Sequence, residues 1–383
     1  MHITGIICEY NPLHLGHEKQ LKYIRSQFGT DSGIVCLMSG NFVQRGHPAI
    51  TDKSMRAKAA LLCGADLVLE LPITASLSSA EGFAAKGVEI LSGFCDCLCF
   101  GAETNDKALL TQTAEVLLQP VFSQKLLEQL EKGLSFPAAR QKAVEAMGIP
   151  GSFLALPNNI LAIEYCKAII SQHASMEPFP ILREGSYHDT APNSENPSAT
   201  AIRNLMLQSD LWLDYIPEKA RDCFRGASLH TVSSGEQAIL YRLRTMTDAD
   251  YEALPYGSEG LWRKLMHAGR SCGTLQEVID AVKSKRYTRS RIDRMLVCAV
   301  LGITEKDLHT PVPYVRVLAL NDRGRQILRK AREHGSFRNP GEHADDPYEL
   351  LETRVQDLYG LFCTDGPEPP GTEKNRRIVY ETI

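Results

Sequence analysis

The turn between the first two predicted elements reads Glu9-Tyr10-Asn11-Pro12-Leu13-His14-Leu15-Gly16-His17. It follows an apolar, strand-like run over residues 3–8 and leads into a helical pattern. In α/β folds, ligands bind at the carboxyl ends of strands, and a helix N-terminus offers free N–H groups and a positive dipole end to phosphate. Gly16 permits close approach of the backbone, and the flanking His14 and His17 can direct imidazole N–H donors at a phosphoryl group. We therefore predict a phosphate site here, in preference to two surface histidines at a helix start.

The residues around this turn alternate short apolar runs with helical patterns. The strand-like runs cover residues 3–8, 33–38, 67–71 and 97–100, and the helical patterns between them cover residues 17–28, 53–63 and 80–91. This alternation predicts an α/β fold with a parallel sheet and crossover helices. A further helix is expected over residues 160–170, and a further strand over 178–182.

Beyond residue 183 the pattern changes. Residues 184–200 are rich in Ser, Asn, Pro, Thr and Gly, which is typical of a loop. Successive helices follow over 236–245, 260–267, 275–282 and 290–300, and then a strand over 315–320 and a helix over 324–333. We expect a nucleotide-binding domain over residues 1–208. A mainly helical region should follow over 209–383, with a small α/β element near 313–333. The fold of the tail after about residue 335 is not predicted.

Whole-chain composition narrows the class of protein. The 383 residues suffice for about two domains, and the net charge of −4 argues against a general polyanion binder. The sequence has no apolar run of the length that spans a membrane and no signal-peptide pattern, so we expect a cytoplasmic protein. Eleven scattered cysteines favour reduced thiols. Cys95, Cys97 and Cys99 are interpreted as buried small side chains rather than as part of a metal site.

The segment Pro12-Leu13-His14-Leu15-Gly16-His17 resembles the HxGH signature of the nucleotidyltransferase superfamily, whose members attack the α-phosphate of a nucleoside triphosphate. Ser198-Ala199-Thr200-Ala201-Ile202-Arg203 resembles a second signature of these enzymes. Further stretches resemble one family, the bacterial tRNA(Met) cytidine acetate ligases: residues 39–49, 64–72, 157–162, 285–291 and 314–318. The resemblance implies a Rossmann-like parallel sheet of the HxGH type, followed by a mainly α-helical C-terminal region.

The resemblance also implies a two-step reaction. Acetate and ATP would give acetyl-adenylate and pyrophosphate, and the acetyl group would pass to N4 of the wobble cytidine of elongator tRNA(Met). Acetate is already an anion and needs no general base, so positioning and electrostatics should dominate the first step. Mg²⁺ would arrive with the triphosphate, because the sequence offers no metal cage.

Site residues carry over from the resemblance by position. ATP would lie along Ile7, Cys8, Glu9, Tyr10, Asn11, Pro12, Leu13, His14, Leu15, Gly16, His17, Glu18, Lys19 and Gln20. Gly101 would admit the adenosine. Asn159 and Arg183 would complete the nucleotide pocket, with Asn158 as the alternative to Asn159. Ser198, Thr200 and Arg203 would hold the leaving pyrophosphate, and His14, His17 and Arg203 would be the catalytic residues.

Two other groups of residues are candidates for substrate binding. The polar loop with Asn41, Gln44 and Arg45 is expected to hold acetate, ATP or cytidine. Lys53 and Arg56 on the next helix fit a solvated face equally well. Residues 281–294 carry a local net charge of +5, which suits phosphate contacts, and Tyr287 could stack on a base. The expected tRNA-binding residues are Lys283, Lys285, Arg286, Arg289 and Arg291.

Two other functions compete with this one. An adenylyltransferase for a small phosphorylated metabolite shares the HxGH signature, but it leaves the basic stretch and the long C-terminal region unexplained. A non-catalytic nucleotide- or RNA-binding protein has no need of His14, His17 and Arg203 together. The sequence identifies neither the residue that assists acetyl transfer nor those that read the anticodon.

Overall fold

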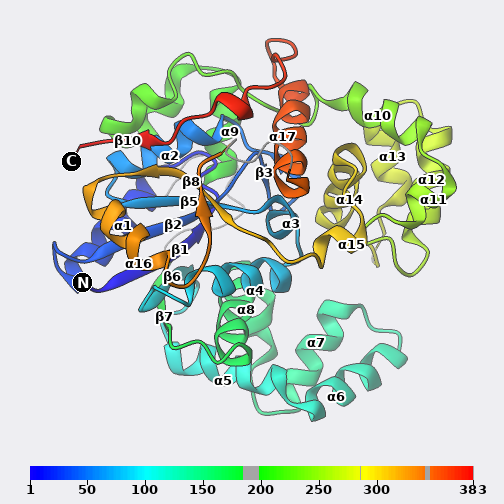
Figure 1. Ribbon diagram of the computed structural model, residues 1–383. Coiled ribbons are helices and arrows are strands. Elements are labelled where there is room, and N and C mark those ends of the chain that lie inside the picture. The colour runs from blue at the N-terminus through cyan, green and yellow to red at the C-terminus, as the bar shows by residue number, and fades with distance from the viewer. Residues whose placement is uncertain (184–197, 285, 341–345, 383) are drawn as a thin grey trace.

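The computed structural model describes residues 1–183, 198–284, 286–340 and 346–382. Its main sheet has the strand order β10-β8-β5-β2-β1-β6-β7, and β9 pairs with β8 (Figure 1). The strands β1, β2, β5, β6 and β7 run parallel to one another. This confirms the α/β fold and the parallel sheet predicted from the sequence. The strands are β1 (Ile3–Cys8), β2 (Gly33–Ser39), β5 (Leu67–Leu71), β6 (Cys97–Ala102), β7 (Glu177–Leu182), β8 (Val315–Leu320), β9 (Phe337–Arg338) and β10 (Val379–Tyr380).

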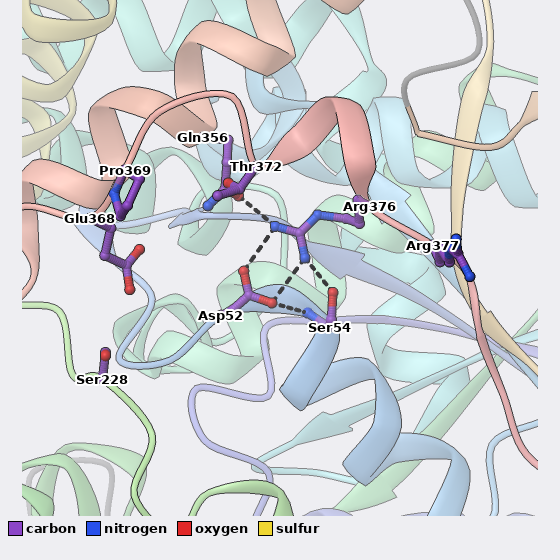
Figure 2. Close-up of a pocket in the computed structure, with 9 residues that line it drawn as sticks. All are labelled: Asp52, Ser54, Ser228, Gln356, Glu368, Pro369, Thr372, Arg376 and Arg377. Carbon is purple, nitrogen blue, oxygen red and sulfur yellow. Dashed lines mark hydrogen bonds and ion pairs between the residues drawn. The ribbon is translucent and has the colours of Figure 1, made fainter.

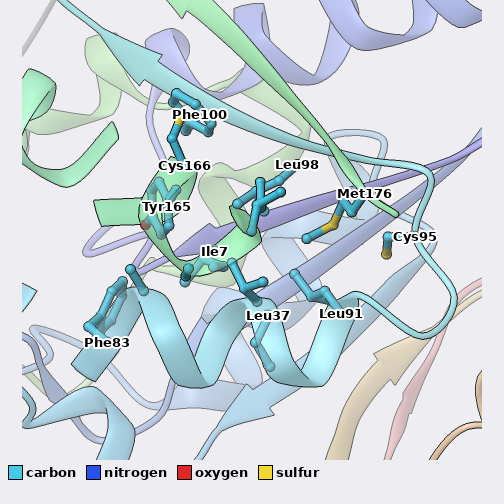
Figure 3. Packing of buried hydrophobic residues seen from close by; sticks show 14 of the residues in the cluster. Ile7, Leu37, Phe83, Leu91, Cys95, Leu98, Phe100, Tyr165, Cys166 and Met176 are labelled. Atoms are coloured by element: carbon cyan, nitrogen blue, oxygen red, sulfur yellow. The ribbon is translucent and has the colours of Figure 1, made fainter. Parts of the chain in front are cut away.

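Helices cover both faces of the sheet, because its central strands are apolar on both sides. Ile7 and Leu37 belong to the core on one face, while their neighbours Ile6 and Cys36 belong to the core on the other. Figure 3 shows the first of these cores, where sheet residues pack with α4 (Ala80–Leu91) and α8 (Pro157–Ser171). The remaining N-terminal helices are α1 (Leu15–Phe28), α2 (Lys53–Leu62), α3 (Ile73–Ser76), α5 (Lys107–Leu118), α6 (Pro120–Glu131), α7 (Phe136–Glu145) and α9 (Ala199–Met206).

The C-terminal helices pack around a separate hydrophobic cluster, which Phe42, Ile73 and Leu77 of the N-terminal part also join. They are α10 (Glu236–Thr245), α11 (Asp248–Glu252), α12 (Leu261–Ser271), α13 (Leu275–Val282), α14 (Arg289–Leu301) and α15 (Glu305–Leu308). α17 (Pro347–Tyr359) lies between them and the sheet (Figure 1). The expected helical region is therefore present, and the boundary near residue 208 stays a prediction.

The strand and helix expected near 313–333 are present, but they extend the main sheet rather than forming a separate element. β8 pairs antiparallel with β5, placing Val68 opposite Ala319. α16 (Asp322–Ala331) then packs through Ile327 and Leu328 into the core on one face of the sheet. The sheet thus combines strands from both ends of the chain.

The tail after residue 335 is held by a buried network of charges. Lys53 Nζ lies 2.8 Å from Glu70 and 2.7 Å from Glu373. Arg316 of β8 bonds to the same two carboxylates at 2.7 and 2.9 Å, and Arg376 lies 2.7 Å from Glu373. Lys53 is fully buried, so the alternative of a solvated face is wrong for it. The network joins the last turn of the chain to the centre of the sheet.

Two further sequence expectations concern the thiols and the membrane. Cys95, Cys97 and Cys99 are buried free cysteines, as expected for structural thiols. Over the described ranges, the helices are all too short or too polar to span a bilayer.

Candidate functional site

The phosphate turn predicted from the sequence forms the N-terminus of α1. His14 is the N-cap residue, and its Nδ1 accepts a hydrogen bond from Gly16 N at 3.1 Å. His17 Nδ1 accepts from His14 N at 3.2 Å. Because both Nδ1 atoms act as acceptors, both rings carry their proton on Nε2. The two Nε2–H groups are thus available as donors, and His14 Nε2 is buried without a hydrogen-bond partner among the described residues.

The two imidazoles are held in a stack and kept neutral. Their ring centroids lie 3.7 Å apart, and Tyr10 packs against His17 at 4.9 Å. Burial lowers the pKa of His14 to about 3, and Arg183 and Arg203 contribute to that shift. Burial and the neighbouring His14 lower the pKa of His17 well below its usual value. The site is thus rich in donors before any ligand adds negative charge.

A side chain at position 16 would crowd the His14 ring. A Cβ there would lie 3.0 Å from Cε1 and 3.1 Å from Nδ1 of His14. Glycine therefore lets the His14 ring fold back over the helix N-terminus without displacement, in addition to leaving the backbone accessible.

The expected ATP-binding stretch divides into inward and outward side chains. Side chains that belong to the protein core leave only their backbone for a ligand: Ile7, Cys8, Tyr10 and Leu13. Glu18 is buried and forms ion pairs with Lys22 and Lys219. Gln20 donates to Cys99 Sγ at 3.4 Å, and Lys19 is exposed.

The second signature lies beside the first. Ser198 caps α9, and its Oγ accepts from Ala201 N at 3.1 Å. Arg203 Nη1 donates to the Asn11 carbonyl at 2.7 Å, and Nη2 donates to Thr200 Oγ1 at 3.0 Å. The guanidinium therefore bridges the two signatures and adds a positive charge beside the N-terminus of α1.

The expected adenosine side of the pocket gathers around the end of β6. Gly101 is exposed, and a Cβ there would meet only Arg183, at 3.9 Å. Arg183 Nη1 donates to Asn158 Oδ1 at 3.3 Å. Asn159 is buried; its Oδ1 accepts from Glu103 N at 3.0 Å, while its Nδ2 lies 3.5 Å from Phe153 O. The geometry favours Asn158 as the ligand-facing residue of the two alternatives.

Glu103 organises this side of the pocket and was missed in the sequence. Its carboxylate accepts from Asn158 N and Nδ2 at 3.1 and 2.7 Å, and from Asn159 N at 2.7 Å. It thereby caps α8 from another element. A lone glutamate after a strand gives no sequence signal for such a role, because the helix that it caps begins more than fifty residues later.

The loop with Asn41, Gln44 and Arg45 includes β3 (Phe42–Val43) and β4 (His47–Pro48). Gln44 N donates to Glu9 Oε1 at 3.0 Å, which fixes the loop to the phosphate turn. Asn41 is buried and donates to Gln356 of α17 at 2.9 Å, whereas Arg45 is exposed. The opposite side of the hairpin faces α14, where His47 lies 3.2 Å from Asp293. The loop therefore connects the phosphate turn to the helical region.

Arg56 of α2 binds the backbone at the carboxyl ends of β1 and β2. It is fully buried, so the alternative of a solvated face is wrong for this residue too. Its guanidinium donates to the carbonyls of Glu9 at 2.8 Å and Ser39 at 2.9 Å, and also to Gly40. Each of these buried carbonyls needs a hydrogen-bond donor, and Arg56 supplies it. The guanidinium therefore holds the segment that follows β1 against the carboxyl end of β2.

The expected tRNA-binding cations are partly paired within the protein. Arg286 and Arg291 lie 3.2 and 3.5 Å from Glu259, and Arg289 lies 2.7 Å from Asp293. Lys283 is exposed, and Lys285 falls outside the described residues. Glu259, which is distant in sequence, lowers the local charge below the +5 counted along the chain.

The structure contradicts one expectation for this stretch. Tyr287 is only 8% exposed, and its hydroxyl donates to the Glu259 carbonyl at 2.7 Å. Its ring is therefore part of the helical core and is not available to stack on a base. Lys264 and Arg291 lie over this ring, which belongs to the helical core, so the basic flanking sequence led to the wrong interpretation.

Comparison with known proteins agrees with this geometry. The family model described as HIGH Nucleotidyl Transferase matches residues 1–364. A tRNA(Met) cytidine acetate ligase of Clostridium perfringens is 38% identical over 359 residues, which cover 88% of this chain and 89% of the relative. A protein of the same name from Acetivibrio thermocellus is 35% identical over 367 residues, covering 88% and 87%.

Two solved structures of Thermotoga maritima TmcAL are similar over the full length of both chains, at 28% identity. The apo form has a TM-score of 0.91 against this chain, and the form bound with alpha-thio ATP has a TM-score of 0.88.

Proposed function

Because this chain belongs to the tRNA(Met) cytidine acetate ligases of the HIGH nucleotidyl transferase family, we propose that it acetylates the wobble cytidine of elongator tRNA(Met). Acetate first attacks the α-phosphorus of ATP, forming a C–O–P bond and releasing pyrophosphate. The N4 amine of cytidine then attacks the acetyl carbon, and AMP leaves. The observation that carries this proposal is the paired Nε2–H donors of His14 and His17, with Arg203 beside them.

In the first step, carboxylate and triphosphate repel each other, and the protein must offset that repulsion. His14 and His17 donate to the oxygens of the phosphoryl group as negative charge accumulates there. Their neutral state suits donation without proton transfer, because acetate brings no proton to remove. Asn158, Arg183 and the open backbone at Gly101 hold the adenosine side.

The leaving pyrophosphate lies against the N-terminus of α9. Ser198 and Thr200 supply hydroxyls, and Arg203 supplies a fixed guanidinium, which suits phosphate better than a point charge does. Mg²⁺ would reach the site with the triphosphate, since the carboxylates near the phosphate turn already have partners: Glu9 accepts from Gln44 N, and Glu18 pairs with Lys22 and Lys219. When bound, the ion neutralises charge on the phosphate oxygens.

The transfer step needs the anticodon close to the adenylate. The hairpin with Asn41, Gln44 and Arg45 connects the phosphate turn to α14, so we propose that it holds the acetyl group or the cytidine. Lys283, Lys285, Arg286, Arg289 and Arg291 contact tRNA phosphates from the helical region. A tRNA substrate implies that the reaction takes place in the cytoplasm.

The experiment combines the protein with ATP, labelled acetate and bulk tRNA, followed by nuclease digestion and mass spectrometry. We expect acetate-dependent pyrophosphate release and labelled N4-acetylcytidine. The variant His17→Ala should lose both products, whereas His309→Ala, an exposed histidine of the helical region, should keep both. Pyrophosphate release without the modified nucleoside would overturn the second step. Turnover with a phosphorylated metabolite but not with acetate would favour an adenylyltransferase instead.

A further inference from the structure

Three metal-ligating side chains meet outside the nucleotide site. One donor atom each from His230, Cys363 and Glu368 lies within 4.8 Å of the other two. His230 Nε2 and Glu368 Oε2 are 3.3 Å apart. His230 and Cys363 are buried, with exposures of 2% and 6%. The set provides a nitrogen, a sulfur and an oxygen donor, all of which bind zinc in proteins.

The backbone brings these residues together without help from a ligand. His230 and Cys363 face each other in an antiparallel bridge. Thr231 N donates to Phe362 O at 2.9 Å, and Thr364 N donates to Leu229 O at 2.8 Å. In this register the facing pair makes no backbone bonds between its own members, and its side chains lie close together on one side. The His230 ring is also stacked on Tyr359, with centroids 3.9 Å apart.

The His230 ring is poorly satisfied, since among the described residues its ion-pair partner is Glu368, 3.3 Å from Nε2. Neither of its nitrogens makes a hydrogen bond with the part of the chain that the structure describes. Buried imidazoles normally make well-formed hydrogen bonds, so a ring with no partner for Nδ1, a carboxylate 3.3 Å from Nε2 and a thiol close by points to a bound ligand.

The Glu368 side of the cluster is open. Glu368 lines a cavity of about 580 Å³, together with Asp52, Ser54, Ser228, Gln356, Pro369, Thr372, Arg376 and Arg377 (Figure 2). The other two ligands are buried behind it. A metal held by three protein ligands here would keep a fourth position for water or a small anion from the cavity.

We propose that His230, Cys363 and Glu368 form a zinc site. Typical zinc–ligand bonds require the donor atoms to be roughly 3.3–3.8 Å apart, so the cluster must contract by about 1 Å. Glu368 is already 3.3 Å from His230 and is the most exposed of the three side chains at 31%, so it has the most room to adjust. When the zinc–sulfur bond forms, the Cys363 thiol releases its proton to solvent, and no electron is transferred.

The zinc site would hold the C-terminal segment near the phosphate turn. His230 N donates to Ile50 O at 2.9 Å, and Ile50 N donates to Asn11 Oδ1 at 2.7 Å. Zinc would therefore fix residues 360–368 to a segment that is bonded directly to the phosphate turn. We expect its main effect to be on stability, because a metal that binds only the folded state raises the melting temperature.

The test uses the full chain without a histidine tag, stripped of metal by chelation and dialysis. Zinc is added in a titration, and bound metal is measured after gel filtration. Cobalt is added to a second sample as a spectroscopic probe. We expect about one zinc per chain, a thiolate-to-cobalt charge-transfer band, and a higher melting temperature with zinc than without it.

Matched variants identify the ligands. Cys363→Ser should remove the charge-transfer band, and His230→Gln and Glu368→Gln should weaken zinc binding by more than about tenfold. Cys272→Ser, a half-buried cysteine elsewhere, should leave band and affinity unchanged. Glu368→Gln keeps the test valid if the buried variants fail to fold. An absent band in the unmodified protein, or equal zinc affinity in Glu368→Gln, would overturn the proposal.

Discussion

Arg203 donates a hydrogen bond to the carbonyl of Asn11, with Nη1 and O 2.7 Å apart. This bond joins two signatures that are separated by almost two hundred residues. It also orients the guanidinium, whose other arm reaches Thr200 at 3.0 Å. The positive charge is therefore in position before pyrophosphate develops.

The variant Arg203→Lys tests whether the two hydrogen bonds of the guanidinium, to Asn11 and Thr200, contribute to catalysis. Lysine keeps the charge but cannot bond to Asn11 and Thr200 together, so acetate-dependent pyrophosphate release should fall by about 10²-fold or more. Arg325→Lys, at an exposed arginine of α16, serves as the control and should change nothing. Wild-type rates in Arg203→Lys would mean that only net charge matters there.

The two histidines should make the protein less stable in mild acid. Burial lowers the folded-state pKa of His14 to about 3, whereas an unfolded histidine titrates near 6.5. Between these values the unfolded state binds more protons, so the free energy of unfolding falls as the pH drops below about 6.5. Urea unfolding at pH 7.5 and 5.5 measures the loss. His14→Gln should lose less stability between the two pH values, and an equal loss would contradict the assignment.

Removing the Glu103 carboxylate should weaken ATP binding. In Glu103→Gln, one oxygen replaces two as acceptor for Asn158 and Asn159, so the start of α8 is less well positioned. The KM for ATP should rise roughly tenfold or more, with a smaller change in kcat. Glu128→Gln, at an exposed position of α6, is the control. An unchanged KM would remove Asn158 from the nucleotide pocket.

Arg286 and Glu259 should have opposite effects on tRNA affinity. Their exposed ion pair is weak, so an RNA phosphate can replace the carboxylate. Arg286→Ala should weaken tRNA binding and reduce the slope of log K against log salt by about 0.7–0.9, while adenylate formation stays normal. Glu259→Gln should bind tRNA more tightly. Lost adenylate formation with normal tRNA affinity in Arg286→Ala would contradict this assignment.

The buried charge network should dominate the stability of the C-terminal tail. Glu373→Gln leaves the buried Lys53 and Arg316 with less negative charge beside them, and should destabilise the fold by about 3–5 kcal/mol. Glu381→Gln breaks the exposed pair with Lys58 and should cost at most about 1 kcal/mol. Denaturant unfolding compares the two variants. Similar losses would mean that the network contributes little.

The local patterns predicted the elements well. Apolar runs and helical patterns identified β1, β5, α4, α10 and α13 at their observed bounds, because each depends on residues that are close in sequence. The position of His14, Gly16 and His17 at a helix N-terminus was predictable for the same reason, because one short segment supplies all of them.

Long-range partners were not predictable. In the sequence, Lys53 and Arg56 look like two surface cations. Their acceptors are found only in the folded structure, and one of them, Glu373, lies more than three hundred positions from Lys53. In the sequence, Tyr287 looks like a residue that could stack on an RNA base. Only the packing of the helical core shows that its ring is buried. A single sequence contains the members of such clusters but not their assembly.

The antiparallel pairing of β5 with β8 also affects how the protein is synthesised. Leu71 ends β5, and the strand that pairs with it is complete only about 250 residues later, at Leu320. At ribosomal speeds of about 5–20 residues per second, this delay lasts roughly 12–50 s. Throughout that interval, the nascent chain exposes an apolar strand edge of the kind that templates aggregation. Chaperone supply during translation should therefore limit the yield of this protein more than its final stability does.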